Sequence, residues 1–543
     1  MDRKDFFRSL TSKKQASRYG NGRMFFSGLN PYSGNWTINE VTHLLKRAMF
    51  GAKKTDIDYF LSTGMDAAVD ELLNNIVAPS PPLRDYGLIE DDNGGMHDDL
   101  GVPQGQTWVN DPNTASDEVV RGSIDRLRFE SLRKWWSGLI LNQDRSIQEK
   151  MVLFWHHHYA VQQEEVGNSL FLWRHHNLLR SNVLGNVKDL AKEVTIDPAM
   201  LLHLNGYLNS RQAADENYAR EFQELFTIGR ESATGFTEND VIACARVLTG
   251  WRFTTNPITV YSDTSAHDTT SKTFSSFYNN TVISGGDAMQ ELNALVDMIF
   301  ATNEAAKFFC RKIYKWFVYY EIDEDTELNV IAPLADILRN NNYNVQPMLV
   351  ALFKSEHFFD TINQSCYIKT PFDILAGTMR EFNVPVPAYT DYATGYPMFQ
   401  ILFERASMMQ MELFQPPDVS GYAAYTQDPM NYELWVNSNS LPRRADYTDS
   451  LVNESIIDVR AFAGYSSNPA DPDQLVSDVT TLLLRYPLSV NSKNYVKQNF
   501  LLNNTTDNTI WTNAWNTNDN SVIDSSLKNM FRFIMNLPEF HLC

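Results

Sequence analysis

The sequence predicts an all-α fold: a large multi-helix globular domain with long irregular loops. Apolar residues recur at helical spacing along most of the chain. No stretch of any length alternates apolar and polar residues as a half-buried strand does. The chain has 543 residues, of which 43% are hydrophobic and 12% aromatic, so it is long enough for a large core.

Three regions follow one another along the chain. Residues 1–36 are polar and are expected to form an N-terminal arm. A helical core domain is expected over 37–460, and its first helix is marked by Thr37 and Glu40, which fit a capping box. Residues 461–543 alternate short helical stretches with an Asn/Thr-rich loop, and we expect this C-terminal segment to pack on the core.

Within the core domain, helical patterns alternate with two irregular stretches. Residues 78–118 hold several prolines and an acidic, glycine-bearing run, which predicts a long loop. Residues 384–444 are rich in turns but contain the helical pattern FQILFERASMMQMELF. The helical patterns elsewhere in this domain cover 119–255, 286–320, 330–358 and 370–382.

The charge balance excludes some classes of partner. Lys plus Arg is 46 and Asp plus Glu is 66, for a net charge of −20. Such a chain is not expected to bind nucleic acid or an anionic membrane surface, since both require a basic face. The four cysteines are widely separated and are expected to be reduced thiols. No window predicts a membrane span and no secretory signal is visible, which favours the cytoplasm.

Three adjacent histidines follow Phe154 and Trp155 in the stretch FWHHHY. In a helix, His156 and His158 differ by about 200°, whereas in an extended stretch they share one side. The pair can therefore chelate a metal only if the helix ends near Trp155 or His156. Otherwise at most one of the two faces a given site. The alternative is that they are interfacial residues of a buried helix, hydrogen-bonded to the backbone or to carboxylates.

A second candidate is the stretch DENYAREFQELFTIG, residues 215–229. On a helical wheel its apolar residues form one arc and its polar residues the other. The apolar arc holds Tyr218, Ala219, Phe222, Leu225 and Phe226, and the polar one Glu216, Asn217, Arg220, Glu221 and Glu224. The polar face is either a solvated ladder of ion pairs or a set of carboxylates facing a cleft opposite the histidines.

A polar loop with His267, Asp268 and Lys272 follows the stretch LTGW. Such a loop is more often solvated than catalytic. No phosphate-binding, dinucleotide-binding, nucleophile-elbow or HExxH motif occurs in the chain. The sequence therefore does not name a reaction.

Several stretches together resemble the bacterial family of unknown function numbered 1800, DUF1800, from about residue 37 to the end. The closing LPEFHLC is similar to members from the Bacteroidota. In this family the pattern Phe-Trp-His-x-His matches His156 and His158, and Glu-Asn-x-x-Arg-Glu matches Glu216, Asn217, Arg220 and Glu221. The stretches that carry the resemblance are HLLKRAMFG, FWHHHY, LGNVKDLAKEVTIDPAML, ENYAREFQELFTIG, FTENDVIACARVLTGW, HD…K, FFCRKIYKWFV, QPPDVSGY and LPEFHLC.

The resemblance implies a helical protein of unsettled activity. It also implies a periplasmic or extracellular location, and a partner from a neighbouring gene for an exported protein with a phosphatase-like fold. The chain departs from the family pattern in two places: Asn205-Gly206 replaces Asp-Asn, and Tyr422 stands where Trp is common.

Two hypotheses remain. The first is a metal-dependent or acid–base enzyme, a hydrolase or oxidoreductase, with His156, His158, Glu221 and Glu224 as ligands of zinc, iron or manganese. In it, Arg220 orients the site, Glu221 or Glu224 is the base, and His267 and Asp268 lie on a loop that closes over the cleft. The second is a non-catalytic binding or scaffold protein of an exported system. Its polar cluster is structural, and its function lies in a groove near Tyr422 and Trp435 that recognises a carbohydrate or another exported protein.

Overall fold

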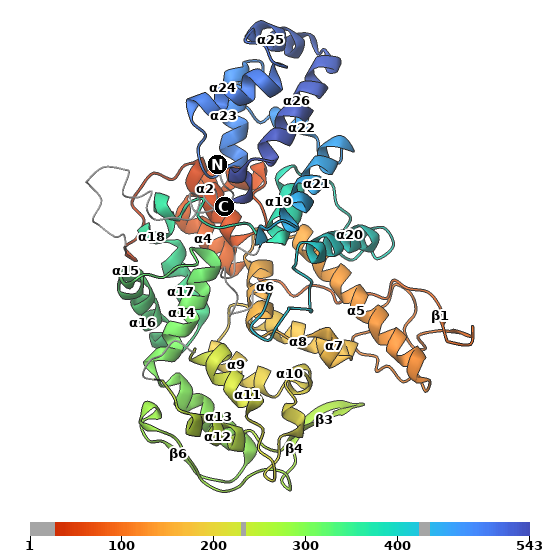
Figure 1. The fold of residues 1–543 in the computed structure, drawn as a ribbon, viewed down its shortest axis with the longest axis vertical. Coiled ribbons are helices and arrows are strands. Elements are labelled where there is room, and N and C mark those ends of the chain that lie inside the picture. Colours follow the sequence, from red (N-terminus) through yellow and green to blue (C-terminus); the bar gives the residue numbers. More distant parts are fainter. Residues whose placement is uncertain (1–27, 230–234, 423–434) are drawn as a thin grey trace.

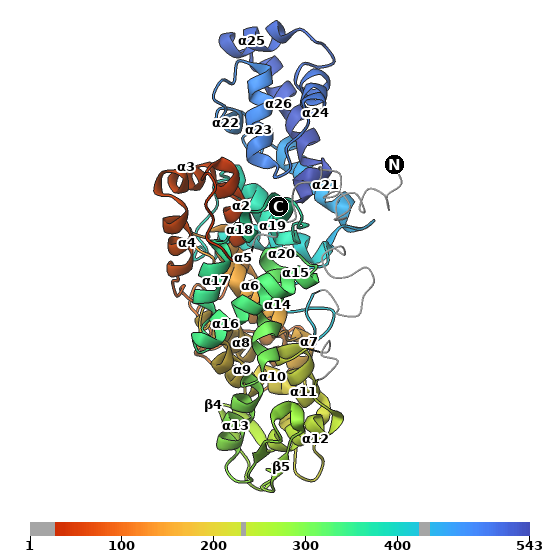
Figure 2. The same ribbon diagram turned by 90° about the vertical axis from the view of Figure 1, so that its left-hand side faces the viewer.

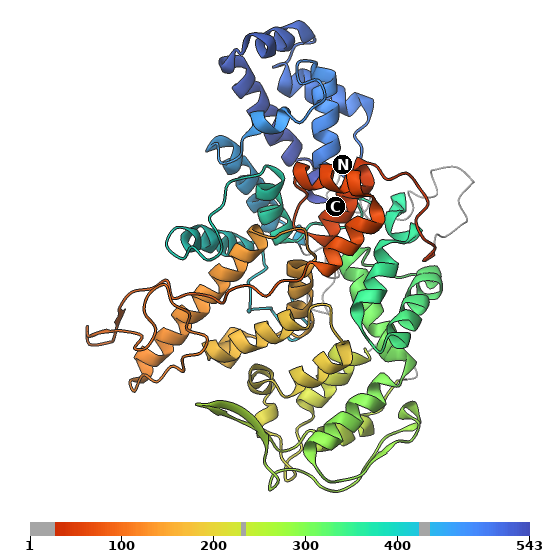
Figure 3. The same cartoon turned by 180° about the vertical axis from the view of Figure 1, so that it is seen from behind.

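The computed structural model describes residues 28–229, 235–422 and 435–543, and it is mostly α-helical, as the sequence predicts. The molecule is elongated, with the C-terminal helices at one end and the segment from α11 to α13 at the other (Figures 1 and 2). Between them, the N-terminal helices and the helices that follow residue 300 lie side by side (Figure 3).

The N-terminal part begins as the sequence predicts. In α2 the side chain of Thr37 caps the first turn and the carboxylate of Glu40 returns to the Thr37 amide, so the predicted capping box is confirmed. The helices and strands of this part are α2 (Ile38–Ala48), α3 (Lys54–Thr63), α4 (Met65–Asn74), β1 (Ile89–Glu90), β2 (Met96–His97) and α5 (Glu118–Leu141).

The predicted long loop before α5 is irregular apart from the two-residue strands β1 and β2. A buried ion pair holds it to the body: Arg128 of α5 contacts the carboxylate of Asp99 at 2.6 and 2.9 Å. The hydroxyl of Tyr86 donates to the same carboxylate at 2.5 Å. The loop is therefore anchored to α5 by a charged, hydrogen-bonded cluster.

The middle of the chain forms short helices that turn back on one another. It carries most of the predicted site residues. Its elements are α6 (Gln148–His158), α7 (Gln163–Val166), α8 (Ser169–Ser181), α9 (Val187–Thr195), α10 (Pro198–His203), η2 (Gly206–Leu208), α11 (Glu216–Glu221), η3 (Phe222–Thr227) and α12 (Glu238–Val247).

A β-hairpin interrupts the region that the sequence predicts to be helical up to residue 255. Strands β3 (Trp251–Thr255) and β4 (Ile258–Ser262) pair antiparallel and project from the body (Figure 3). The ring of Phe253 packs edge-on against Phe171, which ties the hairpin to α8. The prediction is wrong here because five residues alternate too briefly to be distinguished from a helix end. The short strands β5 (Lys272–Thr273) and β6 (Val282–Ile283) and the turn η4 (Ser276–Tyr278) follow.

The second half is helical. Helix α20 ends at Met408 rather than at residue 414, because Gln410 and Phe414 adopt positive φ values of 73° and 63°. The elements of this second half are α13 (Ala288–Phe300), α14 (Asn303–Phe317), α15 (Glu324–Thr326), η5 (Glu327–Ile331), α16 (Ala332–Asn340), α17 (Val345–Phe353), α18 (Glu356–Phe359), η6 (Thr361–Asn363), α19 (Pro371–Glu381), α20 (Gly395–Met408) and α21 (Ser440–Asn453).

The C-terminal helices gather at the top of Figure 1, and α26 packs on α21 and α22. The last residues return to the middle of the molecule, where Leu542 pairs with Ile368. The elements are α22 (Val459–Ala463), α23 (Pro472–Leu483), α24 (Val490–Val496), η8 (Lys497–Leu501), α25 (Asn508–Thr517), α26 (Asn520–Met535) and η9 (Pro538–His541).

Candidate functional site

Helix α6 runs through the whole histidine run and ends at His158. The helix therefore continues, which is the case in which at most one of His156 and His158 faces a given site. The structure places the two rings in different surroundings. His156 contacts the segment that follows α20, whereas His158 contacts the segment that follows α11.

His156 is fully buried and fixes the segment 409–422 onto α6. Its Nε2 accepts the amide N–H of Phe414 at 3.0 Å, and the hydroxyl of Tyr422 lies 3.0 Å from the same nitrogen. The ring packs edge-on against Trp136 and Phe414, at centroid distances of 5.0 and 4.6 Å. Burial, with smaller contributions from His175 and His157, lowers the pKa of His156 well below its usual range. The ring is therefore neutral and carries its proton on Nδ1.

His157, at the variable position of the family pattern, also holds the segment 409–422 onto α6. Its Nδ1 accepts the amide N–H of Tyr422 at 3.1 Å, and its ring stacks on that of Trp316. Gly421 lies so close that a Cβ atom there would stand 2.3 Å from His157 Nδ1. The stretches FWHHHY and QPPDVSGY are therefore in direct contact, although more than 250 positions separate them in the sequence.

His158 points into an aromatic cluster beside η3. Its Nε2 lies 3.2 Å from the carbonyl oxygen of Phe226, which accepts only, so Nε2 carries the proton. The rings of Phe308 and Phe309 lie 5.9 and 5.4 Å from the imidazole. Burial, and secondarily the charge of Lys312, lower the pKa of His158 well below its usual range. This imidazole too is neutral.

The two faces of the carboxylate helix are as the wheel predicts. The residues of the apolar arc are buried. On the other face, Arg220 lies 3.3 Å from Glu216 and 3.7 Å from Glu224, and it also pairs with Glu238. The side chain of Arg220 is 32% exposed. His158 contacts the backbone at Phe226 in the apolar arc, whereas Arg220 and its partners form an ion-pair ladder on the partly exposed face.

The structure does not assemble the predicted metal ligands. His156 and His158 contact different segments, Glu224 pairs with Arg220, and Glu221 is only partly buried on the neighbouring turn. Among the residues that the structure describes, no group of three or more His, Cys, Asp or Glu side chains is placed to hold a metal ion.

The helix α11, which carries the Glu-Asn-x-x-Arg-Glu motif, changes from α-helical to π-helical winding after Glu221. The stretch η3 is π-helical, and its last bond runs from the amide of Ile228 to the carbonyl of Gln223 at 2.9 Å. The side chain of Gln223 is buried and accepts the hydroxyl of Tyr278 at 2.7 Å. The wider turn thus places a polar side chain inside the core with its hydrogen bond made.

In the stretch HD…K, His267 and Lys272 lie in a buried polar network, whereas residues 269–271 between them are exposed. Lys272 is fully buried, donates to the Asp268 carbonyl and pairs with the carboxylate of Glu291. The ring of His267 is 2% exposed, and its Nδ1 lies 2.8 Å from the carbonyl of Thr249. This network fastens the loop to the turn before β3 and to α13.

Asp268 is held by the helix before the hairpin. One carboxylate oxygen accepts from Arg246 at 2.7 Å and the other accepts from Thr270. Burial alone would raise the pKa of Asp268, but the hydrogen bonds from Arg246 and Thr270 outweigh it and keep the pKa below its usual range. This carboxylate is therefore ionised and paired.

A second pair of adjacent histidines, His175 and His176 in the stretch WRHH, was not among the predicted site residues. The Nδ1 of His175 lies 3.0 Å from the carboxylate of Asp197, and its Nε2 lies 2.9 Å from the carbonyl of Tyr159. Asp197 also caps α10. His176 stacks edge-on against Trp136 at 4.4 Å, on the same indole as His156. The adjacent histidines and the Asp-Pro pair at a helix start are signals that could have pointed to this contact.

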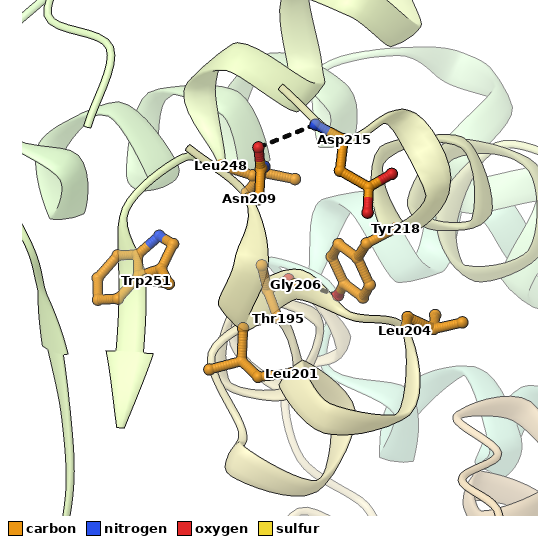
Figure 4. Close-up of a pocket in the computed structure, with 9 residues that line it drawn as sticks. All are labelled: Thr195, Leu201, Leu204, Gly206, Asn209, Asp215, Tyr218, Leu248 and Trp251. Carbon is orange, nitrogen blue, oxygen red and sulfur yellow. Dashed lines mark hydrogen bonds between the residues drawn. The ribbon is translucent and has the colours of Figure 1, made fainter. Parts of the chain in front are cut away.

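A small pocket lies where several of the family stretches meet (Figure 4). The free space at its centre is about 10 Å³, enough for one water-sized group. Sequence reasoning did not single out Thr195, Asn209, Asp215 or Trp251, because each stands at a helix or strand end, where a structural role is the common explanation. The lining residues are Thr195, Leu201, Leu204, Gly206, Asn209, Asp215, Tyr218, Leu248 and Trp251.

Comparison with known proteins gives one result. Residues 43–542 match a family model described as "Protein of unknown function (DUF1800)". No curated protein and no solved structure matches the chain. No helix within the described ranges has both the length and the apolar character needed to cross a membrane.

Proposed function

The chain belongs to the DUF1800 family of proteins of unknown function, and we propose that this member is a non-catalytic binding or scaffold protein. One observation carries the proposal: the histidines of the FWHHHY stretch use their nitrogens to hold other segments of the same chain. Their role is to fix the packing of α6 against two distant segments.

The burial of these rings argues against acid–base catalysis. A general base must reach the proton that it removes, directly or through one water. His156 has no exposed surface and His158 is 4% exposed. The lowered pKa values of both imidazoles follow from the same burial. Such rings serve as neutral hydrogen-bonding groups in a core, where a satisfied polar network selects one arrangement of the packed elements.

The proton positions argue against a shared metal. A histidine binds a metal through a nitrogen without a proton. In His156 that nitrogen is Nε2, which already accepts the Phe414 amide. In His158 it is Nδ1, which accepts no hydrogen bond from the residues that the structure describes and lies in an aromatic cluster.

A groove near Tyr422 and Trp435 is not where we place ligand binding. Tyr422 is 4% exposed and Trp435 is 6% exposed, so neither ring is presented to solvent. The hydroxyl of Tyr422 is directed at His156. Both aromatics are buried core residues.

The experiment is a comparison of His156→Ala, His158→Ala and their double variant with the unaltered chain. Each single substitution leaves a buried backbone group without its partner and creates a cavity, so we expect a loss of about 2–3 kcal/mol in unfolding free energy. His97→Ala is the matched control, because His97 lies on the β1–β2 hairpin with a side chain that is 40% exposed.

Two outcomes would refute the proposal in favour of the enzyme. One is an unchanged unfolding free energy for both single variants. The other is zinc, iron or manganese bound in stoichiometric amount to the unaltered chain and lost from a double variant that still folds.

A further inference from the structure

His175 of α8 is a buried ring whose two nitrogens both face oxygen atoms. The imidazole has no exposed surface. Its Nδ1 lies 3.0 Å from the carboxylate of Asp197, the residue before α10, and its Nε2 lies 2.9 Å from the carbonyl oxygen of Tyr159, the residue after α6. Helices α6 and α10 both pack on α8, so this one side chain joins three helices (Figure 1).

Neither of these oxygens can donate a hydrogen bond to the ring. A carbonyl oxygen only accepts, and so does an ionised carboxylate. A neutral imidazole carries one N–H, and the lone pair of its other nitrogen would then point at an oxygen atom. Both nitrogens must therefore carry a proton, which makes the ring an imidazolium with a positive charge.

The surroundings of Asp197 keep its carboxylate ionised. The oxygen that faces His175 also accepts the amide N–H groups of Ala199 and Met200, at 3.1 and 3.2 Å. Hydrogen bonds from amides favour the charged form of a carboxylate, so the proton of the pair belongs to the imidazole. The two opposite charges have side-chain exposures of 0% and 5%. Buried charges are tolerated when they are paired in this way.

The other titratable groups around this imidazolium are neutral. Burial lowers the pKa of His156 in α6 and of His176 in α8 well below the usual range, and that of His203 in α10 to about 4. The phenol groups of Tyr159 and Tyr218 keep their protons, because burial raises their pKa. One charged ring therefore lies among several neutral ones.

The charged side chains on the helices around α8 are paired or lie toward the surface. Arg180 of α8 is bidentate to Glu149 of α6, at 2.7 and 2.8 Å. The charged residues of α7 and α9 are partly or fully exposed. Helix α5 meets α8 through the ring of Trp135, which packs edge-on against Trp173. The counter-charge of the imidazolium is therefore Asp197.

We propose that His175 is an imidazolium at neutral pH, and that the contact between α6, α8 and α10 depends on this proton. When the ring gives the proton up to solvent, it keeps one N–H and can donate to only one of the two oxygens. The carboxylate of Asp197 then loses its buried counter-charge. Alkaline pH therefore weakens this contact, whereas the neutral buried histidines respond to acid. The charge of His175 is a separate question from the roles of His156 and His158.

The first measurement is a joint neutron and X-ray structure of the perdeuterated full chain, crystallised near neutral pH. We expect deuterium on both Nδ1 and Nε2 of His175 and none on the carboxylate of Asp197. The neighbouring His156 is the internal control, with deuterium on Nδ1 alone. A single deuterium on His175, or one on the carboxyl group of Asp197, would overturn the proposal.

A pair of variants follows the same proton in solution. Asp197→Asn removes the counter-charge, and asparagine caps a helix as well as aspartate does. The matched control is Asp287→Asn. Asp287 caps α13 by accepting two amides at 3.0 Å, and no lysine, arginine or histidine within the described ranges pairs with it. Urea titrations between about pH 6.5 and 8 give the ratio of the unfolding constant of each variant to that of the unaltered chain.

The direction of the pH effect separates the charge from the helix cap. In this window an unfolded histidine has lost its proton, whereas native His175 still holds one. The unfolding constant of the unaltered chain therefore rises with pH through this group, by up to about tenfold per pH unit, and Asp197→Asn lacks this rise. The ratio for Asp197→Asn should fall as the pH rises, and the ratio for Asp287→Asn should stay constant. A constant ratio for Asp197→Asn would mean that Asp197 is only a helix cap, and the proposal would be wrong.

Discussion

At the scale of single residues, the family motif residues that lie in the described structure mostly contact one another within the chain. His156 and His157 each accept a backbone amide from the segment after α20, and His158 donates to a carbonyl. Lys272 is neutralised by Glu291 and Arg220 by three carboxylates. Such contacts account for a polar motif in a helical protein without any catalytic role for its residues. The reason is that a buried polar group costs free energy unless it is paired.

The close approach of Gly421 to His157 gives the first prediction. Gly421 has a φ of 105°, and a Cβ atom there would overlap His157 Nδ1. We expect Gly421→Ala to lower the unfolding free energy by about 1–3 kcal/mol in urea titrations. Gly122→Ala is the control: this glycine lies in α5 with nothing near its Cβ position, and alanine should stabilise the helix by about 0.5–1 kcal/mol. Equal effects of the two substitutions would argue against close packing of Gly421 on His157.

The Lys272–Glu291 pair gives a second prediction. The side chains of Lys272 and Glu291 are 0% and 2% exposed. Lys272→Met should cost about 3–5 kcal/mol, because it leaves a buried carboxylate without its cation. Adding Glu291→Gln should recover part of this loss. A double-mutant cycle on unfolding free energies measures the coupling, and additive effects would show that the two groups do not interact.

At the scale of secondary-structure elements, the histidines are expected to govern different segments. His156→Ala should increase amide hydrogen exchange in residues 411–422, because Phe414 loses its acceptor. His158→Ala should instead increase exchange in residues 222–229, where Phe226 loses its donor. Mass spectrometry of exchanged peptides separates the two. If both variants loosen the same segment, the two rings do not act on separate contacts.

The sequence was informative for elements with long periodic patterns and less so for contacts between them. The wheel of residues 215–229 predicted the buried arc correctly, since burial and apolar character agree along one helix. The β3–β4 hairpin was missed because its strands have five residues each. The partner of His156 could not be predicted, since Phe414 lies 258 positions away and donates through its backbone, which has no sequence signature.

The arrangement of the candidate site residues could not be predicted for the same reason. The sequence identified the polar residues of the motif stretches, but it left open whether they are buried and did not tell which way each ring points. His156 carries its proton on Nδ1, whereas His157 and His158 carry theirs on Nε2, because a ring nitrogen that faces an amide accepts and one that faces a carbonyl donates. The pocket around Trp251 was not predicted, because its walls come from stretches that only the fold brings together.

At the scale of the whole molecule, buried histidines couple stability to pH. Burial keeps the pKa of several imidazoles below the usual value, to about 3 for His157 and about 4 for His203, and well below the usual range for His43, His156, His158, His176 and His541. In the unfolded chain these groups titrate near pH 6.5. The unfolded state therefore binds more protons as the pH falls below that value, and the native state loses stability.

The resulting prediction is a steep loss of stability in mild acid. The unfolding free energy should fall as the pH drops from about 6.5 to 4.5, by up to about 1.4 kcal/mol per pH unit for each buried histidine. Urea titrations across this range measure the slope. His157→Asn should reduce the slope, because it removes one of these buried rings. A profile that is flat down to pH 5 would contradict burial of neutral imidazoles.

A crystal structure of the full chain, purified and crystallised with zinc, iron(II) or manganese, decides between a structural and a metal-binding role for these histidines. Anomalous difference maps locate any bound ion. We predict no peak within about 2.3 Å of any ring nitrogen of His156 or His158, with the amide of Phe414 still donating to His156. A peak at that distance from either ring, shared with the carboxylate of Glu221 or Glu224, would contradict the structural role and establish a metal site.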